Sequence, residues 1–572
     1  QKTWWKEAII YQIYPRSFQD SDSDGIGDLN GITSRLDYIQ SLGVDIIWLN
    51  PIFLSPNDDN GYDISDYREI MREFGTMEDF DRLLKEIHKR EMRLVLDLVV
   101  NHTSDEHPWF EEARKSRHNP YYNYYHWWPA EKGEPPLRLS YFDEEGNAWT
   151  YNKPTDSYYL HYFSRKQPDL NWENPEVRQE IFDMMRFWFD KGIDGFRMDS
   201  ISLIAKDPSF PLIDSKKYPD IFSFYAKEPR LHLYLHEMNR QVLSKYDCMS
   251  VGEGSAVMVD DVAKFVDPAR EELNMLYHFD AARIRNTTLP DNPESGIDYS
   301  LIALKKMFTE WDKAVDKGWP SIYLGNHDQP RMVSRFGSDK DEFRALSAKM
   351  LITFLLTMRG TPYWFAGDEI GMRNIRFDRI EDYNDIDTIN RYKKAKAEGK
   401  DPQAVLDEQK ETGRDNARTP FQWDRSPEAG FTAGTPWLKV NPDYTWINVA
   451  DEEKDPTSIL NYFKKVVSFR KENPSLIYGS YHLLDAENPQ SYTFLRKTGA
   501  DTYLIMLNFS PKAAISTPGI DMSNAHVLLD NYGDRSHMAP QKDITLRPFE
   551  AIVFQLNHPV YESFIDSLDL LE

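Results

Sequence analysis

Two hydrophobic patterns alternate along most of this chain. Short apolar runs that are typical of buried strands are separated by longer segments in which apolar residues recur at helical spacing. The segment 175–191 has that helical spacing and leads into the run Gly195–Asp199, which ends abruptly on charged residues. Strand-like runs recur in the same way at 8–14, 45–50, 93–100, 195–199, 248–253, 273–280, 321–328 and 362–367. Strands that alternate with helices in this number predict an α/β fold of the (β/α)₈ TIM barrel class.

The alternation is interrupted twice. Between residues 105 and 166 it gives way to aromatic residues separated by Pro, Gly and Asp, which indicates a lobe inserted between the third strand and its helix. From about residue 485 the pattern becomes short strands at 491–496, 502–509, 525–529 and 544–556, typical of an antiparallel β domain. The predicted organisation is a barrel of residues 1–104 and 167–484, a lobe of 105–166, and a C-terminal β domain of 485–572. Residues 561–572 are expected to form a short amphipathic tail helix.

Three predicted strands end on acidic residues: Asp199, Glu253 and Asp328. In a barrel of this class such residues meet at the carboxyl edge, where the chemistry takes place. Cleavage of a glycosidic bond with retention needs one carboxylate as nucleophile and one carboxyl as general acid/base, and a third acid could hold the sugar as positive charge develops. Arg197 shares a side of its strand with Asp199 and is expected to keep that carboxylate ionised. The alternative for the hexapeptide alone is a structural Arg–Asp pair that caps a strand.

The charge and the aromatic content of the chain indicate which classes of molecule it could bind. A formal net charge of -25 argues against nucleic acid and anionic membranes and suits a neutral ligand. Aromatic residues make up 14% of the chain and gather between 109 and 163, where they could stack on sugars or form the core of the lobe. The single Cys248 excludes an intrachain disulfide, and no apolar run is long enough to span a membrane. The protein is expected to be a monomer, and location in the cytoplasm or the periplasm stays open.

The segment 20–28 carries acidic residues at alternate positions around Gly25 and is similar to the first half of a calcium loop. The favoured interpretation is a Ca²⁺ or Mg²⁺ ion with a structural role. Its ligands would be four carboxylates and one backbone carbonyl: Asp20, Asp22, Asp24, Asp28 and the carbonyl of Ile26. The alternative is a solvated acidic turn.

Five short motifs occur in order with barrel spacing, at 97–102, 167–171, 195–199, 251–253 and 326–328. Together they resemble glycoside hydrolase family 13, the α-amylase family. The similarity is greatest to the α-glucosidase branch that contains oligo-1,6-glucosidases and sucrose isomerases, and it covers nearly the whole chain.

The resemblance implies a role for each matching residue. Asp199 would be the nucleophile, Glu253 the general acid/base and Asp328 the transition-state stabiliser. The side chains that would contact the substrate are Tyr62, Asp63, His102, Phe163, Gln167, Arg197, Ser200, His327, Glu369 and Arg414. Among these, Asp63 and Arg414 would close the pocket at the non-reducing end of the sugar, and Glu369 would reach the +1 subsite. For His102 a buried core role is the open alternative.

The activity that the resemblance implies is hydrolysis of short α-glucosides, α-1,6-linked in the first place, by an exo-acting retaining α-glucosidase. The alternative is a sucrose isomerase or transglucosylase. Sucrose isomerases carry Phe two residues after the acid/base, where this chain has Ser255, although Phe279 keeps the second half of their aromatic clamp. Ser200 matches neither the Val usual in α-1,6 enzymes nor the Thr or Ala of α-1,4 enzymes. A catalytically inactive scaffold of the same fold is disfavoured, because all three acids are present.

Overall fold

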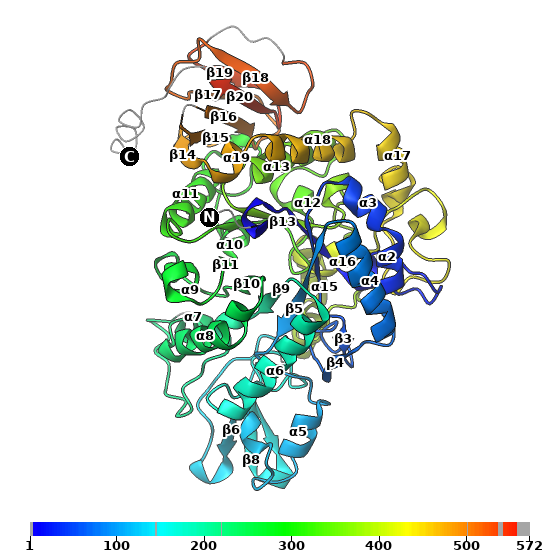
Figure 1. Cartoon of the computed structure of the whole chain (residues 1–572), viewed down its shortest axis with the longest axis vertical. Coiled ribbons are helices and arrows are strands. Elements are labelled where there is room, and N and C mark those ends of the chain that lie inside the picture. The colour runs from blue at the N-terminus through cyan, green and yellow to red at the C-terminus, as the bar shows by residue number, and fades with distance from the viewer. Residues whose placement is uncertain (1–3, 143–145, 219, 500, 536–540, 557–572) are drawn as a thin grey trace.

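Eight parallel strands curl into a barrel in the computed structural model, which describes residues 4–142, 146–218, 220–499, 501–535 and 541–556 (Figure 1). In chain order they are β1 (Ile10–Ile13), β2 (Ile46–Leu49), β5 (Arg93–Val99), β9 (Gly195–Asp199), β10 (Met249–Glu253), β11 (Met275–Tyr277), β12 (Ser321–Ile322) and β13 (Thr361–Phe365). Their order in the sheet is β11-β10-β9-β5-β2-β1-β13-β12. Side-chain hydrogen bonds from Ser321 Oγ to the Leu276 carbonyl (2.9 Å) and from Tyr323 OH to the His278 carbonyl (2.7 Å) link the two ends. The predicted barrel is confirmed.

Alternation along each strand separates the interior of the barrel from its outer layer. Ile10 packs in the inner cluster with Ile46, Val95 and Met249, whereas its neighbour Tyr11 packs in the outer cluster under the helices. Successive side chains of a strand point to opposite faces, so a buried parallel strand needs apolar residues at nearly every position. This requirement explains why the sequence shows continuous apolar runs here.

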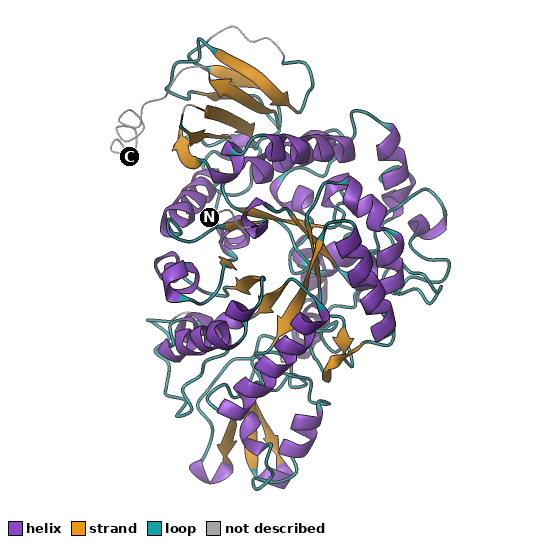
Figure 2. Ribbon diagram, in the orientation of Figure 1, coloured by secondary structure: helices purple, strands orange, loops and turns teal. Residues whose placement is uncertain are grey.

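Helices surround the barrel (Figure 2). The longer ones are α4 (Met77–Lys89), α6 (Pro175–Lys191), α8 (Pro229–Gln241), α11 (Leu301–Ala314), α13 (Arg344–Thr357) and α18 (Ile459–Glu472). The predicted helix at 175–191 is α6: the Asn174 side chain caps its first turn, Pro175 occupies its first position, and Gly192 ends it with a φ of 112°.

The interrupted region between β5 and α6 contains a small antiparallel sheet of order β6-β8-β7, made of β6 (Trp127–Pro129), β7 (Trp149–Asn152) and β8 (Ser157–Leu160). Figure 1 shows it projecting away from the barrel together with α5 (Pro108–Ala113). Trp149, Leu160 and Tyr162 of this region form one buried cluster with Leu203 and Tyr225, which follow β9. The aromatic residues of this region therefore divide between this local cluster and the main core of the barrel, which includes Phe110, Tyr124, Tyr125 and Tyr159.

The C-terminal sheet has five strands in the order β14-β15-β16-β20-β18, made of β14 (Ser480–Leu484), β15 (Ser491–Thr498), β16 (Asp501–Asn508), β18 (Ala525–Asp530) and β20 (Ala551–Leu556). The sheet begins at Ser480, before the predicted boundary at residue 485. The single strand predicted at 544–556 is two strands, since β19 (Ile544–Leu546) pairs with β17 (Ala514–Ser516) and Pro548 separates it from β20. The predicted tail helix lies outside the described residues.

Within those described ranges, no helix combines the length and the apolar character needed to cross a bilayer.

Candidate active site

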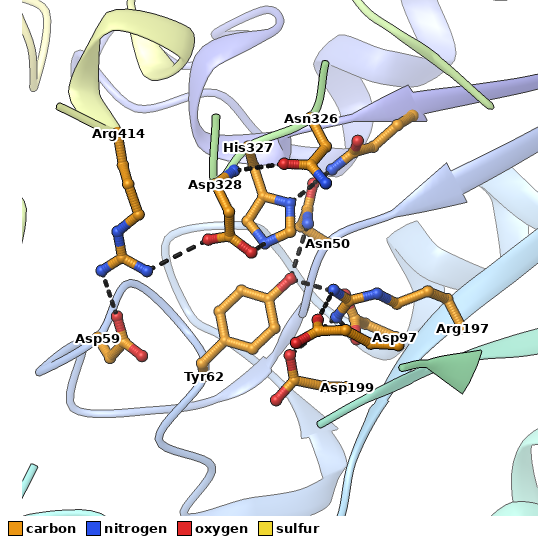
Figure 3. A network of polar contacts seen from close by, with 12 residues as sticks. Asn50, Asp59, Tyr62, Asp97, Arg197, Asp199, Asn326, His327, Asp328 and Arg414 are labelled. Atoms are coloured by element: carbon orange, nitrogen blue, oxygen red, sulfur yellow. Dashed lines mark hydrogen bonds and ion pairs between the residues drawn. The ribbon is translucent and has the colours of Figure 1, made fainter. Parts of the chain in front are cut away.

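The three predicted acids lie together at the carboxyl edge of the barrel. Asp199 ends β9, Glu253 ends β10 and Asp328 follows β12. Arg197 is fully buried, and its Nη1 lies 2.9 Å from Asp199 Oδ1 and 2.9 Å from Asp97 Oδ1 (Figure 3). Its Nη2 contacts Glu253 Oε2. Arg197 and Asp199 lie on the same side of β9, as predicted. One guanidinium therefore serves three carboxylates.

Because a single guanidinium faces several buried carboxylates, the pKa values of the catalytic acids are shifted. Burial raises the pKa of Glu253 to about 8, with Arg197 acting the other way and the neighbouring Asp199 and Asp328 adding to the rise. Burial also raises the pKa of Asp199 to about 7, against the attraction of Arg197 and with the repulsion of Asp97 and Asp328. Burial and mutual repulsion thus make both carboxyl groups easier to protonate, and the higher pKa of Glu253 suits it to the role of proton donor. Arg197 does act to ionise Asp199, as expected, but it does so against larger opposing effects.

Asp328 has the opposite electrostatics. His327 Nε2 lies 3.1 Å from its Oδ2, and Arg414 Nη1 and Arg418 Nη2 lie 3.2 and 3.3 Å from its Oδ1. Burial acts to raise the pKa of Asp328, but His327 and the two arginines hold it well below its usual range. The Asp328 carboxyl is therefore more acidic than those of Asp199 and Glu253.

Tyr62 and His327 connect Asp97 to Asp328. The Tyr62 ring stacks on His327 with centroids 5.3 Å apart and planes at 4°, and its hydroxyl donates to Asp97 Oδ2 at 2.7 Å. Gln12 Nε2 lies 2.8 Å from His327 Nδ1. Because Gln12 donates there, His327 carries its proton on Nε2 and donates it toward Asp328. Figure 3 shows this chain of contacts in one view.

The far end of the site differs from the prediction. Arg414 Nη2 pairs with Asp59 Oδ1 at 3.2 Å, not with Asp63 (Figure 3). Asp63 is fully buried in its own loop, where its carboxylate accepts from Ser55 Oγ at 3.0 Å and from the backbone nitrogens of Asp58 and Asp59 at 2.8 and 3.0 Å. Asp63 thus shapes the loop, and Asp59 is the carboxylate beside Arg414.

His102, Phe163 and Gln167 border the same loop. His102 Nε2 lies 2.9 Å from the Tyr62 carbonyl, and the His102 and Phe163 rings have centroids 5.1 Å apart. Gln167 Nε2 lies 3.2 Å from Asp59 Oδ2. All three predicted residues are therefore within the same cluster of side chains as Tyr62.

Ser200 and Glu369, the two residues predicted to influence linkage preference, differ in where the structure places them. Ser200 follows Asp199 directly, is 3% exposed, and has the left-handed φ of 44° that is uncommon for a residue with a side chain. Glu369 is fully buried in the outer layer, where it accepts from Tyr11 OH at 2.5 Å and Tyr38 OH at 2.8 Å. The prediction that Glu369 reaches the substrate is wrong, because its carboxylate is held away from the interior of the barrel.

The acidic loop brings three of its predicted ligands together. Carboxylate oxygens of Asp20, Asp22 and Asp28 lie within 4.8 Å of one another, whereas the Asp24 carboxylate is not part of this group. Burial and hydrogen bonds with Asp20 and Asp24 raise the pKa of Asp22 to about 6. Such crowding of hard oxygen atoms fits a Ca²⁺ or Mg²⁺ ion.

Residues not foreseen complete the site. Asp97 is the register partner of Arg197 across β5 and β9, and Tyr277 OH donates to Glu253 Oε2 at 3.2 Å. Asp385 Oδ2 binds Arg414 Nε at 2.9 Å. An acidic residue inside the apolar run 93–100 was a readable signal for Asp97, since a buried carboxylate needs a partner. Asp385 lies in an irregular segment, where the sequence has no such signal.

The catalytic-domain profile of α-amylase matches residues 12–479. The chain belongs to the α-amylase family. It is 51% identical to an oligo-1,6-glucosidase of Parageobacillus thermoglucosidasius and 49% identical to that of Bacillus cereus, over 98% and 97% of this chain and 100% of each relative. A trehalulose synthase from Pseudomonas mesoacidophila MX-45 has a TM-score of 0.92 and 43% identity, covering 97% of this chain and 100% of that one. This α-amylase-family protein is a glycoside hydrolase with a carbohydrate substrate.

Proposed function

We propose that the protein is an exo-acting retaining α-glucosidase that hydrolyses short α-1,6-linked glucosides. The observation that carries the proposal is the closeness of Asp199 and Glu253, whose carboxylates both contact the Arg197 guanidinium. Retention needs the two carboxyl groups about 5–5.5 Å apart, whereas inversion needs about 6.5–9.5 Å to admit a water molecule between them.

The two steps follow from the protonation of the site. Asp199 Oδ attacks the anomeric carbon while Glu253 gives its proton to the glycosidic oxygen, which breaks the bond and leaves a covalent glucosyl ester on Asp199. Glu253, now ionised, takes a proton from water, whose oxygen attacks the same carbon and releases glucose and Asp199. Asp328 is the fixed anion that would stabilise positive charge on the sugar ring and bind its hydroxyls.

Exo action is supported by the contacts at the far end. Arg414 bridges Asp59 and Asp328, and its guanidinium lies 5.0 Å from the centroid of the Phe142 ring. These contacts would close the site beyond a single terminal glucose. Binding of the terminal hydroxyl is accordingly proposed for Asp59 and Arg414, and sugar contacts for Tyr62, His102 and His327.

The α-1,6 preference rests on relatives named oligo-1,6-glucosidases, at 45–51% identity. In this chain Ser200 is proposed as the residue that contacts the +1 sugar. We further propose a structural Ca²⁺ or Mg²⁺ ion at Asp20, Asp22 and Asp28, with Asp24 and the Ile26 carbonyl as the remaining candidate ligands.

A second candidate is sucrose isomerisation, because an isomaltulose synthase from Protaminobacter rubrum also matches, with a TM-score of 0.91 and 42% identity over 98% of this chain. Isomerisation requires that the released fructose stay in the site while it turns. Ser255, at the position of the isomerase Phe, places its hydroxyl 3.3 Å from Glu253 Oε1 and offers no ring to hold the fructose. Hydrolysis is therefore the favoured outcome.

Product analysis with isomaltose, isomaltulose, sucrose and maltose tests the proposal, with Asp199→Ala as the inactive control. Free glucose as the main product, fastest from an α-1,6-linked sugar, is the expected result. Isomaltulose or trehalulose as the main product from sucrose would favour the second candidate, and a tenth of wild-type kcat in Asp199→Ala would contradict the assignment of the nucleophile.

A further inference from the structure

A buried ion pair lies behind the sugar-facing residues of the lobe. Lys206, after the short helix η5 (Ile201–Leu203), has its Nζ 3.1 Å from Asp169 Oδ2, and both side chains are fully buried. Burying two charges costs several kcal/mol in desolvation unless close contacts offset it. The two-step reaction above assigns no part to either residue.

Asn101 connects this pair to the site. Lys206 Nζ donates to Asn101 Oδ1 at 2.8 Å, and Asn101 Nδ2 lies 3.1 Å from His102 Nδ1. An ammonium group only donates, so the Asn101 atom that faces Lys206 must be the amide oxygen. The Asn101 amide therefore has one orientation, with its oxygen toward Lys206 and its NH₂ toward His102.

The fixed amide determines where His102 carries its proton. Since Asn101 donates to Nδ1, that nitrogen must accept, and the proton is on Nε2, which lies 2.9 Å from the Tyr62 carbonyl. A carbonyl oxygen only accepts, so both ends of the ring require the same tautomer. Gln167 Nε2, 3.4 Å from His102 Nε2, would prefer the other tautomer, but its contact is the longest of the three. Burial lowers the pKa of His102 to about 3, so the ring is neutral.

We propose that Lys206 and Asp169 are positioning residues that, through Asn101, hold the His102 ring beside the −1 sugar in its neutral Nε2–H tautomer, with that N–H bound to the Tyr62 carbonyl. The contact of His102 with the sugar rests on the proposed function, whereas the tautomer does not. A ring whose tautomer and orientation are fixed in advance costs no reorganisation when substrate binds, so loss of the pair weakens binding and turnover without removing a reacting group.

The test is ¹⁵N-histidine NMR of the full-length protein without substrate, with the His102 signals assigned from their loss in His102→Gln. Wild type is expected to show a protonated Nε2 and an unprotonated Nδ1. The double variant Lys206→Met/Asp169→Asn removes both charges at similar volume, so neither is left unpaired. It is expected to show a mixture of both tautomers and at least a tenfold lower kcat/KM.

The matched control is Lys227→Met/Asp261→Asn, because Lys227 Nζ and Asp261 Oδ2 are also 3.1 Å apart but Lys227 is 41% exposed. It is expected to leave the His102 signals and kcat/KM unchanged. If the Lys206 variant does not fold, Asn101→Asp presents an acceptor to Nδ1 and is expected to move the proton there. A protonated Nδ1 in wild type, or a proton that stays on Nε2 in the variants, overturns the inference. Failure of the proposed function would instead show as absence of glucoside cleavage in wild type with its NMR spectrum as expected.

Discussion

Arg197 and Asp199 stand two residues apart on β9, and Arg197 Nη1 contacts Asp199 Oδ1 at 2.9 Å. The same guanidinium also binds Asp97 and Glu253. Because one positive charge cannot stabilise three buried negative charges, the pKa values of Asp199 and Glu253 are both raised, and that of Glu253 is the higher. An ionised nucleophile beside a protonated acid is the state from which the first step begins.

This sharing predicts the pH dependence. Glu253 must be protonated to donate, so we expect kcat/KM to fall as the pH rises through about 8, the raised pKa of Glu253. Asp199 must be ionised to attack, so kcat/KM falls toward acidic pH as that carboxylate binds a proton. The two limbs of the profile are properties of the coupled pair rather than of either residue alone.

The variant Glu253→Gln tests which residue produces each side of the pH profile. With an activated aryl glucoside, whose leaving group needs little protonation, the variant is expected to keep the acidic limb and to lose the alkaline one. The measurement is kcat/KM against pH for both proteins. An unchanged alkaline limb in Glu253→Gln would assign the proton to another group.

Replacing Asp59 is predicted to lower activity, whereas replacing Asp63 is predicted to lower stability. Asp59→Asn weakens the charged contact with Arg414 and should lower kcat/KM for isomaltose about 10- to 150-fold with little change in Tm, since hydrogen bonds to charged groups are worth about 1.5–3 kcal/mol. Asp63→Asn presents an NH₂ group to donors of its own loop and should lower Tm. If Asp63→Asn raised KM at unchanged Tm while Asp59→Asn had no effect, Asp63 would be the binding residue.

Ser200 is expected to set the linkage preference. Val at this position would crowd an α-1,4-linked +1 sugar, while the additional bond of an α-1,6 link carries that sugar clear. Ser200→Val should therefore raise the isomaltose-to-maltose ratio of kcat/KM, by about 10- to 200-fold at most. The left-handed φ of 44° is strained for a β-branched residue, so Tm is followed as well, and Ser200→Ala, which removes the hydroxyl without adding bulk, is the control. An unchanged ratio, or maltose preferred by wild type, contradicts the proposal.

Metal removal should affect stability rather than chemistry. A cation that binds only the native state adds about 2.7 kcal/mol at a hundred times its Kd, so a chelator is expected to lower Tm. Asp22→Asn, which removes one of the three crowded carboxylates, should have a Tm that no longer responds to the chelator. Loss of activity at temperatures where the fold persists would require a catalytic metal instead.

Periodicity explains how much of the fold the sequence predicts. The buried strands and α6 are regular elements whose side chains repeat every two or 3.6 residues, so their positions follow from apolar spacing. The prediction of one strand at 544–556 was wrong, because Pro548 has no backbone N–H to donate and interrupts the strand. The segments on its two sides, β19 and β20, belong to different sheets.

Site residues on strand ends were predictable for the same reason, and loop residues were not. Asp199 and Glu253 occupy the last positions of strands, where alternation determines their direction. Asp59 and Asp63 lie in one irregular loop, and only its hydrogen bonds decide which of them faces Arg414. Glu369 belongs to the short helix η10 (Asp368–Ile370), so strand alternation says nothing about its direction.

The stereochemistry of the first product tests the central claim most directly. Proton NMR during the first minutes of hydrolysis of an aryl α-glucoside, whose leaving group is not a sugar, distinguishes α- from β-glucose before the anomers equilibrate. Two successive displacements through Asp199 invert the anomeric carbon twice, so the account predicts that the new sugar is α-glucose. Initial release of β-glucose would mean a single displacement by water and would contradict the covalent intermediate on Asp199.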